Sequence, residues 1–306
     1  MTETRIAVLV PCYNEAATVA AVVRGFRTAL PAAAVYVYDN NSTDDTAARA
    51  REAGAAVRQE GRQGKGHVVR RMLADLDADI YVMVDGDDTY DSASSPAMIE
   101  RMLSEKLDLV NGRRIETDPD SYRFGHRWGN HFLSSLISRL FDSRFEDVLS
   151  GYKVFSRRFA KSFPVLSSGF EIETEIAVHA LSLGVPTAEF DTPYRSRQEG
   201  SASKLSTFRD GFRILGTIAV LFKEEKPFSF FAGVAAVLAA VSIGLALPVI
   251  IEFVRSGLVP RQPTALLATG VMLSALLSFV CGVILESVKR GQREIKRLFY
   301  LQTPER

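Results

Sequence analysis

Two carboxylates separated by one glycine stand directly after an apolar run, in the segment Asp85-Gly86-Asp87 that follows Ile80–Val84. Carboxylates at this spacing on a turn can converge on one hard divalent cation, which prefers oxygen ligands. A cation held there could bridge a diphosphate and offset the charge that develops on a leaving nucleotide diphosphate. An inert acidic turn would have the same sequence, so the metal interpretation depends on what lies beside it.

The ends of two earlier apolar runs also carry polar side chains. The segment Pro11-Cys12-Tyr13-Asn14-Glu15 follows Arg5–Val10, and Asp39 follows Val35–Tyr38. Asp39 could accept hydrogen bonds from a nucleoside base or ribose, and the residues after it can cap the helix that follows. Taken alone, each segment is also compatible with an ordinary capped turn between a strand and a helix.

The glycine-rich segment Gly61–Gly66 contains one lysine, Lys65, and could wrap phosphates. It is not a P-loop, because Gln59 takes the place of the first glycine and its last glycine that of serine or threonine. Val69 replaces the last glycine of a dinucleotide fingerprint, and Tyr90 replaces the glycine that an EF-hand loop requires. These departures disfavour nucleoside triphosphate hydrolysis, NAD chemistry and a calcium loop.

The second half of the chain carries further polar clusters, several of them rich in arginine. Arginine suits phosphate because its planar guanidinium offers a fork of hydrogen-bond donors. A lone arginine is more often a solvated surface charge, but two clusters, one of them next to an apolar C-terminal part, favour a phosphate partner at a bilayer. The clusters are Asn111–Arg114, Arg127–Asn130, Asp147–Lys153, Gly169–Glu173, Tyr194–Arg197 and Gly200–Lys204.

The elements that must position these residues alternate between strand and helix patterns. This alternation predicts an α/β domain with a mainly parallel sheet, whose ligands bind at the carboxyl ends of the strands. The predicted strands are Arg5–Val10, Val35–Tyr38, a short one beginning at Val57, and Ile80–Val84; the predicted helices are Glu15–Leu30, Asp44–Ala53 and Gly66–Asp75.

Two uncharged segments near the C-terminus, Ser229–Ile251 and Gln262–Leu285, are each long enough to cross a hydrocarbon core of about 30 Å as a helix. The short polar loop between them predicts a transmembrane hairpin with both ends on one side. Lysines and arginines flank the hairpin on both sides, at positions 223, 226, 289, 290, 293, 296 and 297, which predicts cytoplasmic ends. The N-terminal apolar run is closed by Pro11 and is too short for a secretory signal.

Apolar residues at three- and four-residue spacing precede the hairpin, from Leu205 to Phe222. They predict an amphipathic helix at the membrane interface, although a core helix of the soluble domain would show the same spacing. The predicted organisation is a catalytic domain at residues 1–203, an interface helix at 204–227, the hairpin at 228–288 and a basic cytoplasmic tail at 289–306.

The composition gives no support for a nucleic-acid-binding protein or for a disulfide-stabilised one. Lys and Arg total 37 against 36 Asp and Glu among 306 residues, so there is no basic excess for a nucleic-acid partner. The two cysteines, Cys12 and Cys281, lie in very different settings and imply no disulfide framework, which suits a reducing compartment.

Taken together, the motifs resemble family 2 glycosyltransferases, specifically the polyprenyl-phosphate branch that includes dolichol-phosphate mannose synthase and bacterial undecaprenyl-phosphate glucosyltransferases. The resemblance extends in motif order from Arg5 to about Phe222, and the hairpin matches the membrane anchor of the bacterial branch. It implies a GT-A fold, Mg²⁺ or Mn²⁺ as cofactor, and inversion at the anomeric carbon. Polymer synthesis is disfavoured, because Phe124 stands where the processive enzymes have glutamine in their Q-x-x-R-W signature.

The resemblance also assigns roles to single residues. Asp147, followed by Ser150-Gly151-Tyr152-Lys153, looks like the acid taken as catalytic base, and Asp85-Gly86-Asp87 looks like the DxD turn that binds donor and metal, Asp87 acting in catalysis. Those that look like nucleotide-sugar-binding positions are Pro11, Tyr13, Asn14, Glu15, Asp39, Lys65 and Gly66, and those that match phosphate-binding positions are Arg113, Arg127, Arg195, Arg197 and Lys204.

The expected function is therefore transfer of a hexose from a nucleotide sugar, UDP-linked on family grounds, to undecaprenyl phosphate at the cytoplasmic face of the inner membrane. A phosphate monoester has a second pKa of about 6 and needs little deprotonation, so Asp147 could orient a substrate as much as take a proton. A different lipid acceptor, a non-catalytic membrane partner and a nucleotidyltransferase stay open as alternatives, and so does a homo-oligomer.

Overall fold

The computed structural model describes residues 4–116, 145–167, 169, 171–195, 220 and 222–304. They form two compact units, one within Met1–Gly211 and Lys296–Arg306 and the other within Phe212–Ile295. Three residues with roles predicted from the sequence, Arg127, Arg197 and Lys204, lie outside the described residues, as does most of the predicted interface helix.

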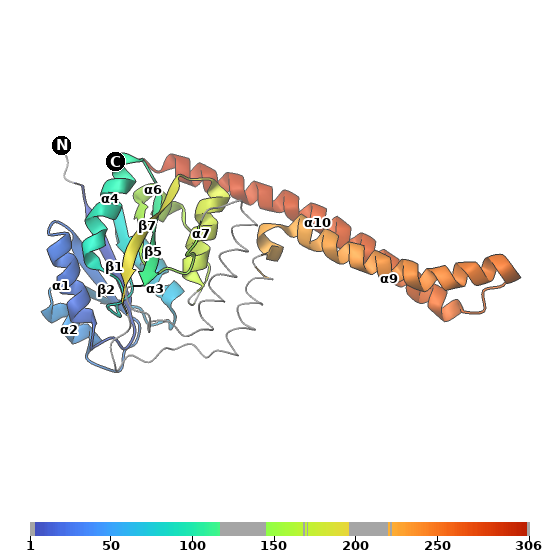
Figure 1. Ribbon diagram of the computed structural model, residues 1–306, viewed down its shortest axis with the longest axis horizontal. Coiled ribbons are helices and arrows are strands. Elements are labelled where there is room, and N and C mark those ends of the chain that lie inside the picture. Colours follow the sequence, from blue (N-terminus) through green and yellow to red (C-terminus); the bar gives the residue numbers. More distant parts are fainter. Residues whose placement is uncertain are drawn as a thin grey trace. The chain divides into compact units, whose positions relative to one another are not determined.

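A seven-stranded sheet in the order β3-β2-β1-β4-β6-β5-β7 forms the centre of the first unit (Figure 1). Only β6 runs antiparallel to its neighbours β4 and β5 among the described strands; the other pairings are parallel. The predicted mainly parallel α/β fold is therefore confirmed. The strands are β1 Ile6–Cys12, β2 Ala34–Asp39, β3 Ala56–Gln59, β4 Ile80–Met83, β5 Leu109–Glu116, β6 Lys153–Ser156 and β7 Thr187–Tyr194.

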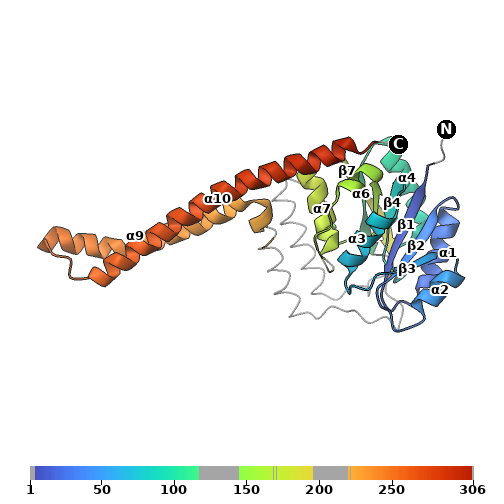
Figure 2. The same cartoon turned by 180° about the vertical axis from the view of Figure 1, so that it is seen from behind.

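Helices cover both faces of the sheet, with α1 and α2 on one side and α3 and α7 on the other (Figures 1 and 2). Strand β1 is buried on both faces, as a central parallel strand should be, because its successive residues Val8 and Leu9, which point to opposite faces of the sheet, are both fully buried. The helices are α1 Val19–Ala29, α2 Thr46–Glu52, α3 Lys65–Asp75, α4 Ser95–Ser104, α6 Arg157–Ser162 and α7 Ile172–Leu183, with a short 3₁₀ turn η1 at Ser92–Ser94.

The first helix begins at Val19, four residues later than its apolar spacing suggests. Asn14 has a left-handed backbone with φ of 53°, and the amides of Thr18 and Val19 both donate to the carbonyl of Glu15. The polar segment after β1 is therefore a turn rather than the first turn of a helix. That turn leaves its side chains at the end of the sheet.

The carboxyl ends of β1, β2 and β4 meet at one edge of the sheet. Connections from β1 lead to β2 and β3 on one side, whereas β4 lies on the other side of β1. The chain thus changes direction across the sheet at β1, and in open α/β sheets ligands bind beside such a point. The polar segments after these three strands all lie at this edge.

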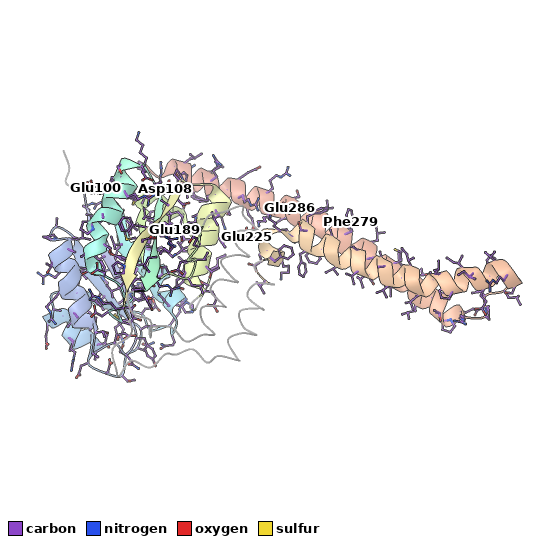
Figure 3. All side chains as sticks on the ribbon, viewed as in Figure 1. Glu100, Asp108, Glu189, Glu225, Phe279 and Glu286 are labelled. Carbon is purple, nitrogen blue, oxygen red and sulfur yellow. The ribbon has the colours of Figure 1, made fainter. Side chains whose placement is uncertain are left out.

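The second unit contains two long helices, α9 Pro227–Ser256 and the first part of α10 Gln262–Gln302. Both helices are long and apolar enough to cross a membrane, with mean hydropathies of 2.7 and 2.2 in their most apolar windows. Their apolar side chains project outward along the unit (Figure 3). The helices contact each other through a 2.7 Å hydrogen bond from Ser242 Oγ to the carbonyl of Ala268, and Gly282 lies against Phe231.

Helix α10 continues through the basic segment after residue 289 and ends at Gln302, so this segment is helical. Its last part, from Lys296, belongs to the sheet unit. There the hydroxyl of Tyr300 donates a 2.6 Å hydrogen bond to the fully buried carboxylate of Asp108. Arg158 donates to the same carboxylate at 2.6 and 2.9 Å and stacks over the Tyr300 ring.

Candidate active site

The acidic turn after β4 is held rigidly by its neighbours. The Asp87 side chain is buried, and its Oδ1 accepts hydrogen bonds from Thr89 Oγ1 at 2.7 Å and Thr89 N at 3.3 Å. The carbonyl of Gly86 accepts a 2.7 Å bond from Thr18 Oγ1. A Cβ at Gly86 would lie 2.6 Å from Cys12 Sγ, so the middle residue of the turn must be glycine.

Lys65 joins this turn to helix α7. Its ammonium at the start of α3 contacts Asp85 Oδ1 and Glu173 Oε1, and only 9% of its side chain is exposed. Burial lowers the pKa of Lys65, but the two carboxylates outweigh burial and raise the pKa above its usual value. Burial raises the pKa of Glu173, and the Lys65 charge offsets only part of that effect. The sequence places Glu173 in a polar cluster but does not predict this contact.

The segment before β6 lies directly against the acidic turn. A Cβ built on Gly151 would be 2.3 Å from Asp85 Oδ2, and the Gly151 amide donates a 2.7 Å hydrogen bond to Tyr90 Oη. The ring of Tyr90 in turn packs at 5.2 Å from that of Tyr194. The turn and the Ser150-Gly151-Tyr152-Lys153 segment, which are far apart in the sequence, are therefore neighbours.

Asp39 lies at the end of β2 with one carboxylate oxygen satisfied and one not. Its Oδ2 accepts a 3.3 Å hydrogen bond from the Ser42 amide, whereas the buried Oδ1 has no hydrogen-bond partner among the described residues. A buried acceptor without a donor is costly, so this oxygen is suited to an N–H or O–H group of a ligand. This geometry is consistent with the predicted contact to a nucleoside.

Asn40 fixes the glycine-rich segment next to Asp39. Its Nδ2 donates to the carbonyls of Glu60 and Arg62 at 2.9 and 2.7 Å, and its Oδ1 accepts from the Gly64 amide at 2.7 Å. The sequence predicts no role for Asn40, because an asparagine in a polar turn gives no sign of which loop it will bind. Through these bonds Asn40 brings Lys65 to the carboxyl edge of the sheet.

The predicted nucleotide-binding segment at the end of β1 divides into structural and exposed parts. Asn14 braces two turns, since its Oδ1 accepts from the Thr43 amide at 2.8 Å and its own amide donates to Ser42 Oγ at 2.9 Å. Likewise the Glu15 amide donates to Thr46 Oγ1 at 2.8 Å. Pro11 is a residue of β1, and it and Tyr13 are partly exposed.

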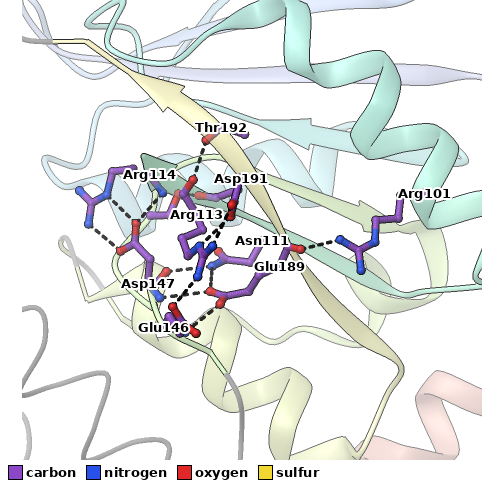
Figure 4. A network of polar contacts seen from close by, with 11 residues as sticks. Arg101, Asn111, Arg113, Arg114, Glu146, Asp147, Glu189, Asp191 and Thr192 are labelled. Carbon is purple, nitrogen blue, oxygen red and sulfur yellow. Dashed lines mark hydrogen bonds and ion pairs between the residues drawn. The ribbon is translucent and has the colours of Figure 1, made fainter. Parts of the chain in front are cut away.

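Asp147 forms a buried ion pair with Arg114 of β5 (Figure 4). Its Oδ2 accepts from the backbone amide of Arg114 at 3.1 Å and from Nε at 2.7 Å, and its Oδ1 accepts from Nη2 at 2.7 Å. The Arg114 guanidinium also lies 5.4 Å from the centre of the Tyr194 ring, which links this pair to Tyr90. Such a bidentate pair orients both side chains strongly.

A second layer of polar contacts holds the backbone around Asp147 (Figure 4). Glu189 of β7 accepts from the amides of Glu146 and Asp147 at 2.9 and 3.1 Å, and Asn111 Nδ2 donates to the Asp147 carbonyl at 2.8 Å. Lys153 is fully buried and donates to Asn111 Oδ1 at 2.5 Å. Burial lowers the pKa of Lys153 to about 8.

The described arginines with predicted phosphate roles have different surroundings. Arg113 binds Asp191 through two hydrogen bonds of 2.7 and 2.8 Å and also contacts Glu146, so a phosphate would have to displace carboxylates from it. The Arg195 side chain is 61% exposed and lies 3.6 Å from Asp91, while its amide binds the carbonyl of Thr89. Arg195 is thus the more accessible of the two.

The chemistry of the acidic turn fits a divalent cation that takes some of its ligands from the protein and the others from a substrate. The described residues contain no cluster of three His, Cys, Asp or Glu side chains that could cage a metal alone. Magnesium in phosphate-transfer sites takes one or two carboxylates and completes its octahedron with substrate phosphates and water. Asp85 and Asp87, with glycines at positions 86 and 151 beside them, match that kind of donor set.

Comparison with known proteins identifies the fold. Residues 7–163 match the family described as Glycosyl transferase family 2. The glycosyltransferase AglJ of Haloferax volcanii is 32% identical over 97% of this chain and 98% of its own length. A dolichyl-phosphate hexose transferase of the same organism is 26% identical over 72% of this chain and 95% of its own.

Solved structures agree with the sequence comparison. Glucosyl-3-phosphoglycerate synthase of Mycobacterium tuberculosis, crystallised with Mn²⁺, UDP and phosphoglyceric acid, superposes with a TM-score of 0.58 at 25% identity. The match covers 72% of this chain and 78% of the synthase. With a family match over half of its residues and a relative aligned along nearly all of it, the chain is a glycosyltransferase that belongs to glycosyl transferase family 2.

Proposed function

We propose that this enzyme transfers a hexose from a nucleotide sugar, UDP-linked, to undecaprenyl phosphate at the cytoplasmic face of the inner membrane, with inversion at the anomeric carbon. The observation that carries the proposal is the meeting of Asp39, Lys65 and the Asp85-Gly86-Asp87 turn at one edge of the sheet. Two relatives support it by name, one as a dolichyl-phosphate hexose transferase and one as a synthase crystallised with UDP and Mn²⁺.

The donor nucleotide is bound by Asp39 and the glycine-rich segment. The buried Oδ1 of Asp39 accepts a hydrogen bond from the nucleoside, and the loop fixed by Asn40 lies next to it. Asp85 and Asp87 would hold the Mg²⁺ or Mn²⁺ that accompanies the donor diphosphate. When bound, the cation supplies Lewis-acid stabilisation of the leaving diphosphate.

The acceptor phosphate needs orientation more than deprotonation, because a monoester with a second pKa of about 6 is already ionised at neutral pH. Asp147 fits an orienting role, since its carboxylate accepts three hydrogen bonds from Arg114. Arg195, with the arginines and lysine predicted outside the described residues, supplies the positive charge for an anionic lipid head group. Holding both anionic substrates in fixed positions is itself a large part of such catalysis.

Helices α9 and α10 anchor the enzyme as a transmembrane hairpin in this proposal. Their length and hydropathy support the span, and the lysines and arginines that flank it support a cytoplasmic catalytic unit. A polyprenyl chain partitions into the bilayer, so an anchored enzyme meets its acceptor at the membrane surface. The domain boundaries predicted from the sequence form part of the same proposal.

A comparison of acceptors tests the proposal. Purified full-length enzyme in vesicles would receive UDP-hexose with either undecaprenyl phosphate or diacylglycerol, and lipid-linked sugar would be measured. We expect product only from the phosphate, and loss of at least about 10²-fold in rate in Asp87→Ala, the scale of losing an electrostatic contact to the transition state. Transfer to diacylglycerol alone would assign a hydroxyl acceptor, and full activity of Asp87→Ala would remove the metal role.

A further inference from the structure

The ammonium of Lys65 lies between carboxylates from two separate parts of the chain. Asp85 belongs to the turn after β4, and Glu173 to the first turn of α7. Their side chains are 28% and 6% exposed, so Glu173 is the more deeply buried partner. Lys65 thus neutralises charge at the same turn that the proposed function assigns to a divalent cation.

A divalent cation at Asp85 cannot leave the Lys65 contact unchanged. Asp85 Oδ1 faces Lys65, and its Oδ2 lies so close to Gly151 that an added Cβ there would be 2.3 Å away. A cation with the short metal–oxygen distances of Mg²⁺ competes with the ammonium for the same carboxylate and also repels it. Glu173 lies outside the acidic turn and can keep the ammonium after it leaves Asp85.

We propose that Lys65 and a divalent cation compete for Asp85, and that Glu173 is the positioning residue that retains Lys65 when the cation binds. This inference rests on the metal role in the proposed function. Without Glu173, displacement of Lys65 from Asp85 would leave a buried ammonium with no carboxylate beside it, which is costly. Glu173 therefore strengthens cation binding through Lys65 rather than by ligating the metal.

A double-mutant cycle tests this inference without any activity measurement. Mn²⁺ binding to the full-length protein, with UDP at the same saturating concentration in every sample, would be titrated by electron paramagnetic resonance in wild type, Lys65→Met, Glu173→Gln and the double variant. We expect Lys65→Met to tighten Mn²⁺ binding and Glu173→Gln to weaken it, each by about tenfold, a usual size for coupling between sites. In the Lys65→Met background, Glu173→Gln should change the affinity less than about twofold.

A matched control removes the same charge two residues earlier, in Glu171→Gln, and should leave Mn²⁺ affinity within about twofold of wild type. Lys65→Gln is a second variant if Lys65→Met does not fold, because its amide can still donate to Glu173. Equal weakening by Glu173→Gln in both backgrounds would overturn the inference, since it would be a general effect of charge. Failure of the metal role itself differs, because Asp87→Ala would then leave Mn²⁺ binding unchanged.

Discussion

Replacing Asp147 with asparagine separates two roles that this carboxylate could play. Asparagine keeps the shape of the side chain but removes the charge that Arg114 binds at 2.7 Å through both Nε and Nη2. If Asp147 orients Arg114, the variant loses part of that geometry. If Asp147 is instead the catalytic base, the variant loses the proton acceptor itself.

The structure sets the expected size of the effect on stability. The ion pair is largely buried, with side-chain exposures of 14% for Arg114 and 7% for Asp147. Breaking a buried pair on one side costs about 3–5 kcal/mol. For a unit of about 200 residues, each kcal/mol lowers Tm by roughly 2–4 °C, so we expect Asp147→Asn to lower Tm by roughly 6–12 °C at the small end of that cost.

The assay compares initial transfer rates of Asp147→Asn, Arg114→Met and the double variant, with undecaprenyl phosphate as acceptor and binding of UDP as a folding control. We expect each single variant to lose about tenfold in kcat/KM and the double variant to lose no more, because the two side chains act as one unit. The acidic limb of the rate should stay near pH 6 in Asp147→Asn, since it reports the acceptor phosphate.

The opposite pattern would refute the orienting role. Loss of a general base costs about 10²–10⁴-fold. A loss of that size in Asp147→Asn, combined with nearly wild-type activity of Arg114→Met, would make Asp147 the base. Disappearance of the acidic limb in Asp147→Asn would point the same way.

Three further changes have effects that follow from single contacts. Gly151→Ala places a Cβ 2.3 Å from Asp85 Oδ2. We therefore expect the variant to bind Mn²⁺ at least about tenfold more weakly than wild type in a titration, whereas unchanged binding would show that the turn can move. The pKa of Lys153 is lowered to about 8, so the folded state binds fewer protons than the unfolded state between about pH 8 and 10.5, and stability should rise with pH there. Wild type should therefore gain Tm relative to Lys153→Met over that window, and a constant difference would contradict it. Tyr300→Phe removes the 2.6 Å bond to buried Asp108 and should cost about 1.5–3 kcal/mol, measured as a lower Tm of the full chain, with no change indicating that the end of α10 is not held there.

The order of strands and helices could be predicted from the sequence because the patterns that indicate them are local. Apolar strands ending in polar turns are visible as patterns of adjacent residues, and β1, β2 and β4 begin and end within two residues of expectation. The start of α1 could not be predicted from local patterns, because the left-handed backbone of Asn14 and its hydrogen bond to Thr43 depend on a neighbouring turn. The helical continuation of α10 to Gln302 also lay beyond the apolar pattern.

Site residues could be predicted where a sequence motif contains them. They could not be predicted where their role comes from a contact that forms only in the folded chain. Lys65 and Asp85 were both singled out, but their joint contact with Glu173 depends on how α7 packs. The two neighbouring arginines of β5 show the same limit. Successive side chains alternate between the faces of a strand, and the sequence alone does not say that Arg114 rather than Arg113 binds Asp147.

The most direct test of the proposed function is transfer from a panel of radiolabelled nucleotide sugars to undecaprenyl phosphate by the purified full-length enzyme. The reactions would contain Mg²⁺ or Mn²⁺ and would be repeated with EDTA. We predict that one UDP-sugar gives a lipid-linked hexose of inverted anomeric configuration, and that EDTA abolishes its formation. No product from any donor, with protein that still binds UDP, would contradict the assigned acceptor, and product that persists in EDTA would contradict the metal.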